Sequence, residues 1–144
     1  MAGSVQDTYA AAVQHDLVVV PEGALVLGVA RRPLPWLLAV VDENRPELGP
    51  PADLLSAVKG RARTPLEDGL SDAEAHNRAM NDLDYESQYR AYLWESRPAQ
   101  QSIADLRKRV ESGTDLVLVC YENTDEKRCH RTILREVLLE AIDG

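Results

Sequence analysis

Both cysteines and one of the three histidines of this chain fall within one short stretch near the end of the sequence. An apolar run, Leu116–Cys120, is followed by a tyrosine, Glu122 and a polar segment, and then by Cys129, His130 and Arg131. A thiol beside an imidazole can supply a nucleophile, and a carboxylate can orient the imidazole or act as a general base. The sequence therefore places candidate catalytic side chains at Cys129, His130 and Glu122.

The same stretch carries basic side chains at the point where a helix is expected to begin. The first turn of a helix presents unpaired N–H groups and partial positive charge, which oppose basic side chains. Lys127, Arg128, His130 and Arg131 nevertheless gather there, in a chain with 24 acidic and 16 basic residues. A bound anion, most commonly phosphate, would relieve this conflict, with Arg131 among its ligands. The alternative is that the arginines form ion pairs with acidic neighbours such as Glu122.

Cys120 is expected to be a small buried residue at the end of the strand, beside the site, and we count it among the binding residues. Together with Cys129, His130 and Glu122 it could also supply ligands to zinc. Adjacent residues on a helix point about 100° apart, however, so the pattern disfavours a metal site, and we expect no cofactor. The spacing of the two cysteines is not Cys-x-x-Cys, which argues against a thioredoxin-like redox role.

Weaker signals lie elsewhere in the chain. Arg31 and Arg32 follow an apolar run and precede a proline, which places them at the end of a strand. They could form a second contact to the anion, or they could be ordinary surface charge. His15 and His76 are isolated in the sequence, and we expect both to face solvent.

The elements that must position these residues alternate between buried strands and helices. The apolar run 24–29 shows no polar alternation, which is typical of a strand buried on both faces. The clearest strand is 115–120, which is apolar from Leu116 onward. Residues 5–13 fit either an edge strand or a short helix, and 36–41 fit either type of element. Helices are expected over 53–61, 71–81, from Asp84 onward, 98–113 and 129–142, with Ser71 and Asp84 as N-caps and 63–69 as a loop.

This alternation predicts an α/β fold. We expect a single three-layer domain over 1–144, with a small, mainly parallel sheet flanked by helices. Its core would span about 24–142, and 1–14 would form an edge strand or be loosely ordered. A chain of 144 residues is long enough to build such a core without disulfides or metals.

Composition excludes several classes of function. With a net charge of -8, broad binding to duplex nucleic acid is disfavoured, because phosphate neutralisation needs a basic face. No apolar run is long enough to span a bilayer, and the first residues do not resemble a secretory signal, so we expect a cytoplasmic protein with reduced thiols. Lysine occurs only at positions 59, 108 and 127. Such an acidic surface suits a high-salt cytosol, or an ordinary acidic protein from a GC-rich genome.

The motif Leu-Val-Cys120-Tyr-Glu122, a polar loop and Cys129-His130-Arg131 resembles the hallmark of the domain of unknown function 488 family. Pro46-Glu-Leu-Gly49 and Tyr89-Arg-Ala-Tyr-Leu93 are similar to two further family segments, and Arg31-Arg32-Pro33 is similar to a family strand end. Gly28 and Ala30 depart from that pattern, which usually has Asp and Arg there. The resemblance covers about 24–142. It implies a small cytoplasmic α/β domain with its site at the terminal motif, and it implies no particular reaction.

Three functional hypotheses follow. The chain could be an enzyme acting on a phosphorylated or nucleotide substrate, with the anion held by Arg131 and by Arg31 or Arg32. It could be a non-catalytic module that recognises a nucleotide or the end of a nucleic acid strand. The motif could also be purely structural, locking the last strand to the last helix. The sequence does not indicate an oligomeric state.

Overall fold

A four-stranded parallel sheet forms the centre of the computed structural model, which describes residues 2–121 and 128–143. The strands are β1 (Val5–Tyr9), β2 (Leu25–Gly28), β3 (Glu43–Asn44) and β4 (Leu116–Cys120), in the spatial order β1-β4-β2-β3. Every adjacent pair is parallel. The strand that ends at Cys120 therefore lies in the middle of the sheet, between β1 and β2.

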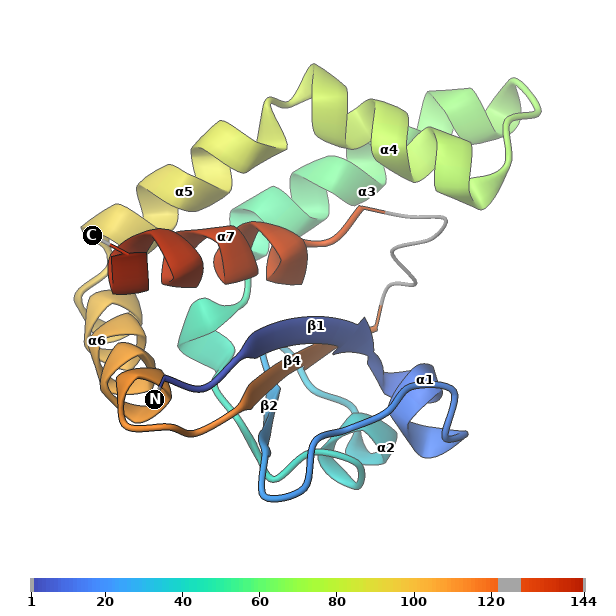
Figure 1. Cartoon of the computed structure of the whole chain (residues 1–144). Helices are drawn as coiled ribbons and strands as arrows, with labels where there is room; N and C mark the ends of the chain where they lie inside the picture. Colours follow the sequence, from blue (N-terminus) through green and yellow to red (C-terminus); the bar gives the residue numbers. More distant parts are fainter. Residues whose placement is uncertain (1, 122–127, 144) are drawn as a thin grey trace.

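Helices cover both faces of this sheet (Figure 1). The short helices α1 (Ala10–Gln14) and α2 (Pro35–Leu38) lie on one face, and the longer helices lie on the other. Side chains of β4 alternate between two apolar cores: Leu116, Leu118 and Cys120 face the larger one, whereas Val117 and Val119 face the smaller. The expected α/β class with a small parallel sheet is confirmed. The remaining elements are η1 (Pro46–Leu48), α3 (Ala52–Glu67), α4 (Asp72–Asp82), α5 (Tyr85–Glu95), α6 (Arg97–Glu111) and α7 (His130–Asp143).

Two local expectations were wrong. The segment 63–69 is largely helical, because α3 continues to Glu67 across Pro65. Its buried stripe, Leu54, Val58 and Ala62, packs in the same core as α4, and this packing extends the helix despite the hydrogen bond that a proline removes. Asp84 precedes α5 but makes no side-chain capping bond. Ser71, in contrast, caps α4 by accepting a hydrogen bond from the Glu74 amide.

The N-terminal segment contains both elements that its sequence allowed. Residues 5–9 form the edge strand β1, and 10–14 form α1. β1 pairs with β4 over its full length, from Val5 beside Leu116 to Tyr9 beside Cys120. This register aligns the carboxyl ends of β1 and β4 at the edge of the sheet where sites in α/β folds are built. Within the described residues, no helix is long and apolar enough to cross a membrane.

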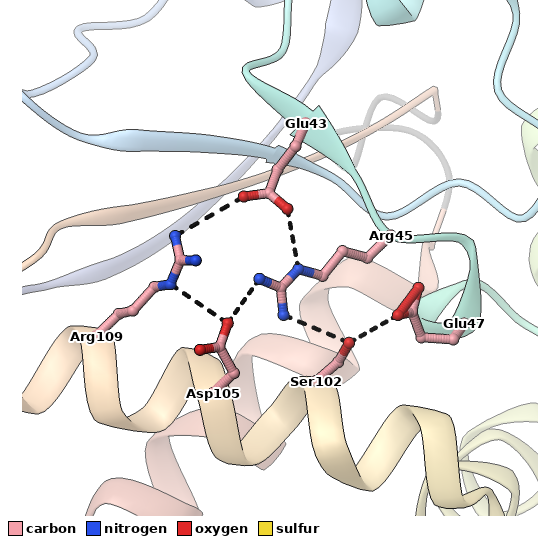
Figure 2. A network of polar contacts seen from close by, with 6 residues as sticks. All are labelled: Glu43, Arg45, Glu47, Ser102, Asp105 and Arg109. Carbon is pink, nitrogen blue, oxygen red and sulfur yellow. Dashed lines mark hydrogen bonds and ion pairs between the residues drawn. The ribbon is translucent and has the colours of Figure 1, made fainter.

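A polar network fastens the segment after β2 to helix α6, as Figure 2 shows. Arg45 donates to Glu43 at 3.2 Å and to Asp105 at 2.7 Å, and it lies 3.4 Å from the Ser102 hydroxyl. Ser102 in turn donates to the Glu47 carboxylate at 2.8 Å. The hydrogen bond from Arg45 lowers the pKa of the Asp105 carboxyl. The network holds β3 and η1 against α6.

Arg45→Met is expected to lower the free energy of unfolding by about 2 kcal/mol, because hydrogen bonds to charged groups in a half-buried network are lost. Arg107→Met is the matched control, since Arg107 forms only an exposed ion pair with Glu111 on the same helix. It should change stability by no more than about 0.5 kcal/mol. Urea denaturation measures both, and equal effects would show that the network contributes no more than a surface pair.

Candidate functional site

Two thiols and an imidazole meet at the carboxyl end of β4. Cys120 is the last residue of that strand, Cys129 directly precedes α7, and His130 begins it. The Nδ1 atom of His130 lies 3.5 Å from Cys129 Sγ and 4.0 Å from Cys120 Sγ. All three ligand atoms lie within 4.8 Å of one another, and each residue is buried. We call these three residues the Cys-Cys-His cluster.

A backbone carbonyl determines which nitrogen of His130 faces the thiols. The Nε2 atom lies 2.7 Å from the carbonyl oxygen of Val29, which can only accept a hydrogen bond. Nε2 must therefore carry a proton. Nδ1 is left to accept a proton from a thiol, or to donate one to a thiolate once it has been protonated. The ring of Tyr89 packs edge-on against the imidazole, with 5.5 Å between centroids, and fixes its plane.

The geometry differs from the one on which the argument against a metal site was based. Cys129 and His130 were expected to lie together on a helix, where their side chains would diverge. Helix α7 begins at His130, so Cys129 lies in the preceding segment and its thiol turns toward the imidazole. The strand and the segment before α7 also bring the two thiols together across the eight intervening residues.

The pKa values of the two thiols are shifted in opposite directions. Burial alone would raise the pKa of Cys129, but the hydrogen bond from Cys120 and the charges of His130 and Arg131 bring it well below its ordinary value. The same hydrogen bond to Cys129, together with burial, raises the pKa of Cys120 well above its ordinary value. Of the two thiols, Cys129 is thus the one that ionises more readily, and Cys120 is its hydrogen-bond donor.

Arg131 is completely buried, and it faces the edge strand. Its Nε lies 3.3 Å from the Asp7 carboxylate, which also accepts a hydrogen bond from Thr132 at 3.1 Å. Arg135, one turn later on α7, lies 3.9 Å from the same carboxylate. Asp7 was not singled out by its sequence, because it lies far from the motif and no local pattern marks it. The expected partner, Glu122, lies outside the described residues.

A cavity of about 400 Å³ lies over the Cys-Cys-His cluster. Its walls include the apolar side chains of Leu55, Val58, Met80 and Tyr85. None of the described residues that line it is acidic, although the chain as a whole carries a net charge of -8. Its cationic or imidazole side chains come from five different elements or loops: Arg31, Arg32, Lys59, His76, Arg128 and His130.

The two arginines after β2 differ in their surroundings. The guanidinium of Arg31 donates to the carbonyls of Pro50 at 3.0 Å and Gly49 at 2.9 Å, and to the Tyr92 hydroxyl at 2.6 Å. Arg32 is exposed at the cavity. Arg31 therefore holds the wall of the cavity in place, and Arg32 is the one that can turn toward a ligand.

The other two segments that resemble the family pattern, 46–49 and 89–93, are joined to the wall held by Arg31. Tyr89 and Tyr92 donate hydrogen bonds to the carbonyls of Leu48 and Glu47. A Cβ at Gly49 would lie 2.4 Å from the Arg31 backbone nitrogen, so this close approach requires glycine. These contacts fix the turn after η1 against α5 and below the cavity.

The glycine at position 28, where the family pattern usually has Asp, also has a structural reason. A Cβ at this position would lie 2.5 Å from the side-chain oxygen of Asn44. That asparagine bonds both the amide and the carbonyl of Ala30, each at 3.1 Å. The side chain of Asn44 therefore occupies the space beside residue 28, and it supports the backbone that leads to Arg31.

His76 was expected to face solvent, and that expectation was wrong. It is half-buried, lines the cavity and lies 2.8 Å from the Arg128 carbonyl. His15 is exposed, as expected. Sequence reasoning also missed Lys59, which belongs to α3. The spacing of Lys59 and His76 on their helices carried no signal, because only the packing of α3 and α4 brings them to this cavity.

A second, larger hollow of about 590 Å³ lies between α5, α6 and α7. Its described lining holds no cysteine or histidine, and it includes the acidic residues Glu111 and Glu140. A further hollow of about 460 Å³ is also lined by Cys129 and Arg128, together with Asp84, Glu86 and Glu136, but neither Cys120 nor His130 lines it. All three residues of the cluster meet in the cavity of about 400 Å³, which we take as the candidate site.

Comparison with known proteins gave one match. Residues 19–142 match a family model described as "DUF488-N3a: Active DUF488-N3 subclade". No curated protein and no solved structure showed significant similarity. The matched range contains every residue of the Cys-Cys-His cluster and of the cavity wall, and it extends over most of the chain. The chain therefore belongs to the DUF488 family.

Proposed function

We propose that this protein binds a phosphorylated small molecule or a nucleotide in the cavity, and acts on it as an enzyme whose reaction centre is the Cys-Cys-His cluster. The observation that carries the proposal is the charge of the cavity. Its described lining holds four arginine and lysine side chains and no carboxylate, in a strongly acidic chain. A concentration of positive charge around one hollow attracts anions and raises their local concentration.

The shape and polarity of the cavity favour a ligand with two parts. Arg32, Lys59 and Arg128 provide cations for a phosphate group. Met80 and Tyr85 provide an apolar wall on which a flat ring can lie. A nucleotide combines these features, since it carries a charged phosphate and an aromatic base.

The proposal of an enzyme rather than a binding module rests on the cluster. A thiol with a lowered pKa and a buried imidazole are arranged where a ligand in the cavity would touch them, which is typical of catalytic sites. Cys129 supplies the thiolate, and Nδ1 of His130 exchanges a proton with the thiols. Arg131 acts on the thiolate through its charge. Glu122 remains a predicted catalytic residue.

Isothermal titration with inorganic phosphate and with nucleoside monophosphates tests this function. Arg32→Gln and Lys59→Gln should each weaken binding about fivefold, equivalent to about 1 kcal/mol for the loss of one nearby cation. Arg107→Gln and Lys108→Gln are the matched controls, because these residues line the other hollow, and they should leave affinity unchanged. If the control variants weaken binding as much as the two cavity variants do, the cavity is not a specific anion site.

The catalytic part needs a separate variant. Compared in the metal-free state, Cys129→Ser should retain ligand binding but lose turnover in a screen of phosphorylated metabolites and nucleotides. If wild type binds these ligands but converts none of them, the non-catalytic binding module is the correct reading. If neither phosphate nor a nucleotide binds, the proposed function is wrong.

A further inference from the structure

We propose that the Cys-Cys-His cluster is a zinc site whose fourth coordination position opens into the cavity. Cys120, Cys129 and His130 supply two sulfur ligands and one nitrogen ligand. When zinc is bound, Cys129 and Nδ1 of His130 are metal ligands, so the free-thiolate chemistry of the proposed function belongs to the metal-free state, and the anion-binding part applies to both states. Only the identity of the fourth ligand rests on the proposed function.

The distances fit zinc coordination with little rearrangement. Tetrahedral zinc, with bonds of about 2.3 Å to sulfur and about 2.0–2.1 Å to nitrogen, places nitrogen and sulfur ligands about 3.6 Å apart and two sulfurs about 3.8 Å apart. Nδ1 of His130 lies 3.5 Å and 4.0 Å from the two sulfurs, and the three ligand atoms all lie within 4.8 Å of one another. A shift of less than an ångström, on the order of side-chain motion, completes the geometry.

The orientation of His130 is the second argument. A histidine that binds a metal through one nitrogen usually donates the other N–H to a carboxylate or a backbone carbonyl. The Val29 carbonyl accepts this bond at 2.7 Å, which leaves the lone pair of Nδ1 aimed at the two sulfurs. Tyr89 holds the ring plane from the side. The imidazole is thus preorganised for a ligand located between the thiols.

The charge of the zinc centre and its open coordination position also support the proposal. Two thiolates balance the charge of Zn²⁺, so the loaded centre is neutral once Cys120 has released its proton to solvent. All three residues line the cavity, so the fourth position faces a space large enough for water and a ligand. Three protein ligands and one open position are typical of catalytic rather than structural zinc. An oxygen of the bound anion is the fourth ligand expected here.

Cobalt titration of the full chain, freed of metal with a chelator under reducing conditions, tests the site. Wild type should bind one Co²⁺ per chain, with thiolate charge-transfer and tetrahedral absorption bands, and zinc should displace it. Cys120→Ser, Cys129→Ser and His130→Ala should each weaken binding by more than about 100-fold, more than the loss of a second-shell partner. His76→Ala is the matched control, because His76 lines the same cavity but lies outside the cluster.

X-ray absorption of the zinc-loaded wild type keeps the test independent of how the variants fold. The expected first shell holds two sulfurs and two nitrogen or oxygen atoms, and added phosphate should alter it. Binding that is as strong in His130→Ala as in His76→Ala, or a zinc shell without sulfur, would overturn the proposal. If the cluster does not bind zinc but Arg32→Gln still weakens phosphate binding, the zinc site alone is refuted. Zinc binding without any phosphate affinity would refute the proposed function alone.

Discussion

Arg131→Met should lower the free energy of unfolding by about 3 kcal/mol, because it removes one member of a buried ion pair. Arg131 has no exposed surface, and its Nε lies 3.3 Å from the Asp7 carboxylate on β1. The loss falls at the lower end of the usual range of about 3–5 kcal/mol, since Asp7 retains 18% exposure and its bond from Thr132. The pair fastens the edge strand to α7, so the loss is a loss of global stability.

Arg135→Met is the matched control for this prediction. Arg135 lies one turn along the same helix and faces the same carboxylate at 3.9 Å, but its side chain is 39% exposed. Its replacement should cost about 1 kcal/mol or less. Urea unfolding of both variants measures the difference. Equal stability of Arg131→Met and wild type would contradict a structural role for the Arg131–Asp7 pair.

In the metal-free protein, Cys129 should react with iodoacetamide at a pH where ordinary thiols are still protonated. Alkylation requires the thiolate, so the rate rises with pH through the pKa of the attacked thiol. The pKa of Cys129 lies well below its ordinary value, so its rate should reach a plateau at lower pH than that of a free cysteine. The raised pKa of Cys120 should keep that residue unreactive at neutral pH. Mass spectrometry resolves the two sites.

Two substitutions at position 120 test whether the hydrogen bond from Cys120 lowers the pKa of Cys129. Cys120→Ala removes the hydrogen bond to Cys129, so the alkylation profile of Cys129 should move to higher pH. Cys120→Ser keeps a donor at the same place, so its profile should stay close to that of wild type. A profile that is identical in all three proteins would show that Cys120 does not stabilise the Cys129 thiolate.

The features that could be predicted from the sequence are those that local patterns encode. The unbroken apolar run 116–120 identified the central strand, and the apolar stripe after Cys129 identified the last helix. Their order also placed Cys120 beside Cys129 and His130, because a parallel strand and the helix that follows it meet at the carboxyl edge.

The rest depends on packing that no local pattern records. Asp7 reaches Arg131 only through the register of β1 on β4. Lys59 and His76 reach the cavity only because α3 packs on α4. The convergence of Cys129 and His130 depends on whether the helix starts at one residue or the next, a boundary that sequence patterns do not resolve.

The central claim is that an anion binds over the Cys-Cys-His cluster, and protection of Cys129 from alkylation tests it most directly. The measurement compares the alkylation rate of the metal-free wild type in phosphate with the rate in chloride at equal ionic strength. Phosphate should slow the reaction in a saturable way, with a midpoint equal to its dissociation constant from titration, and Arg32→Gln should shift that midpoint to higher concentration. Equal rates in phosphate and chloride, from a thiol that reacts readily, would contradict the claim.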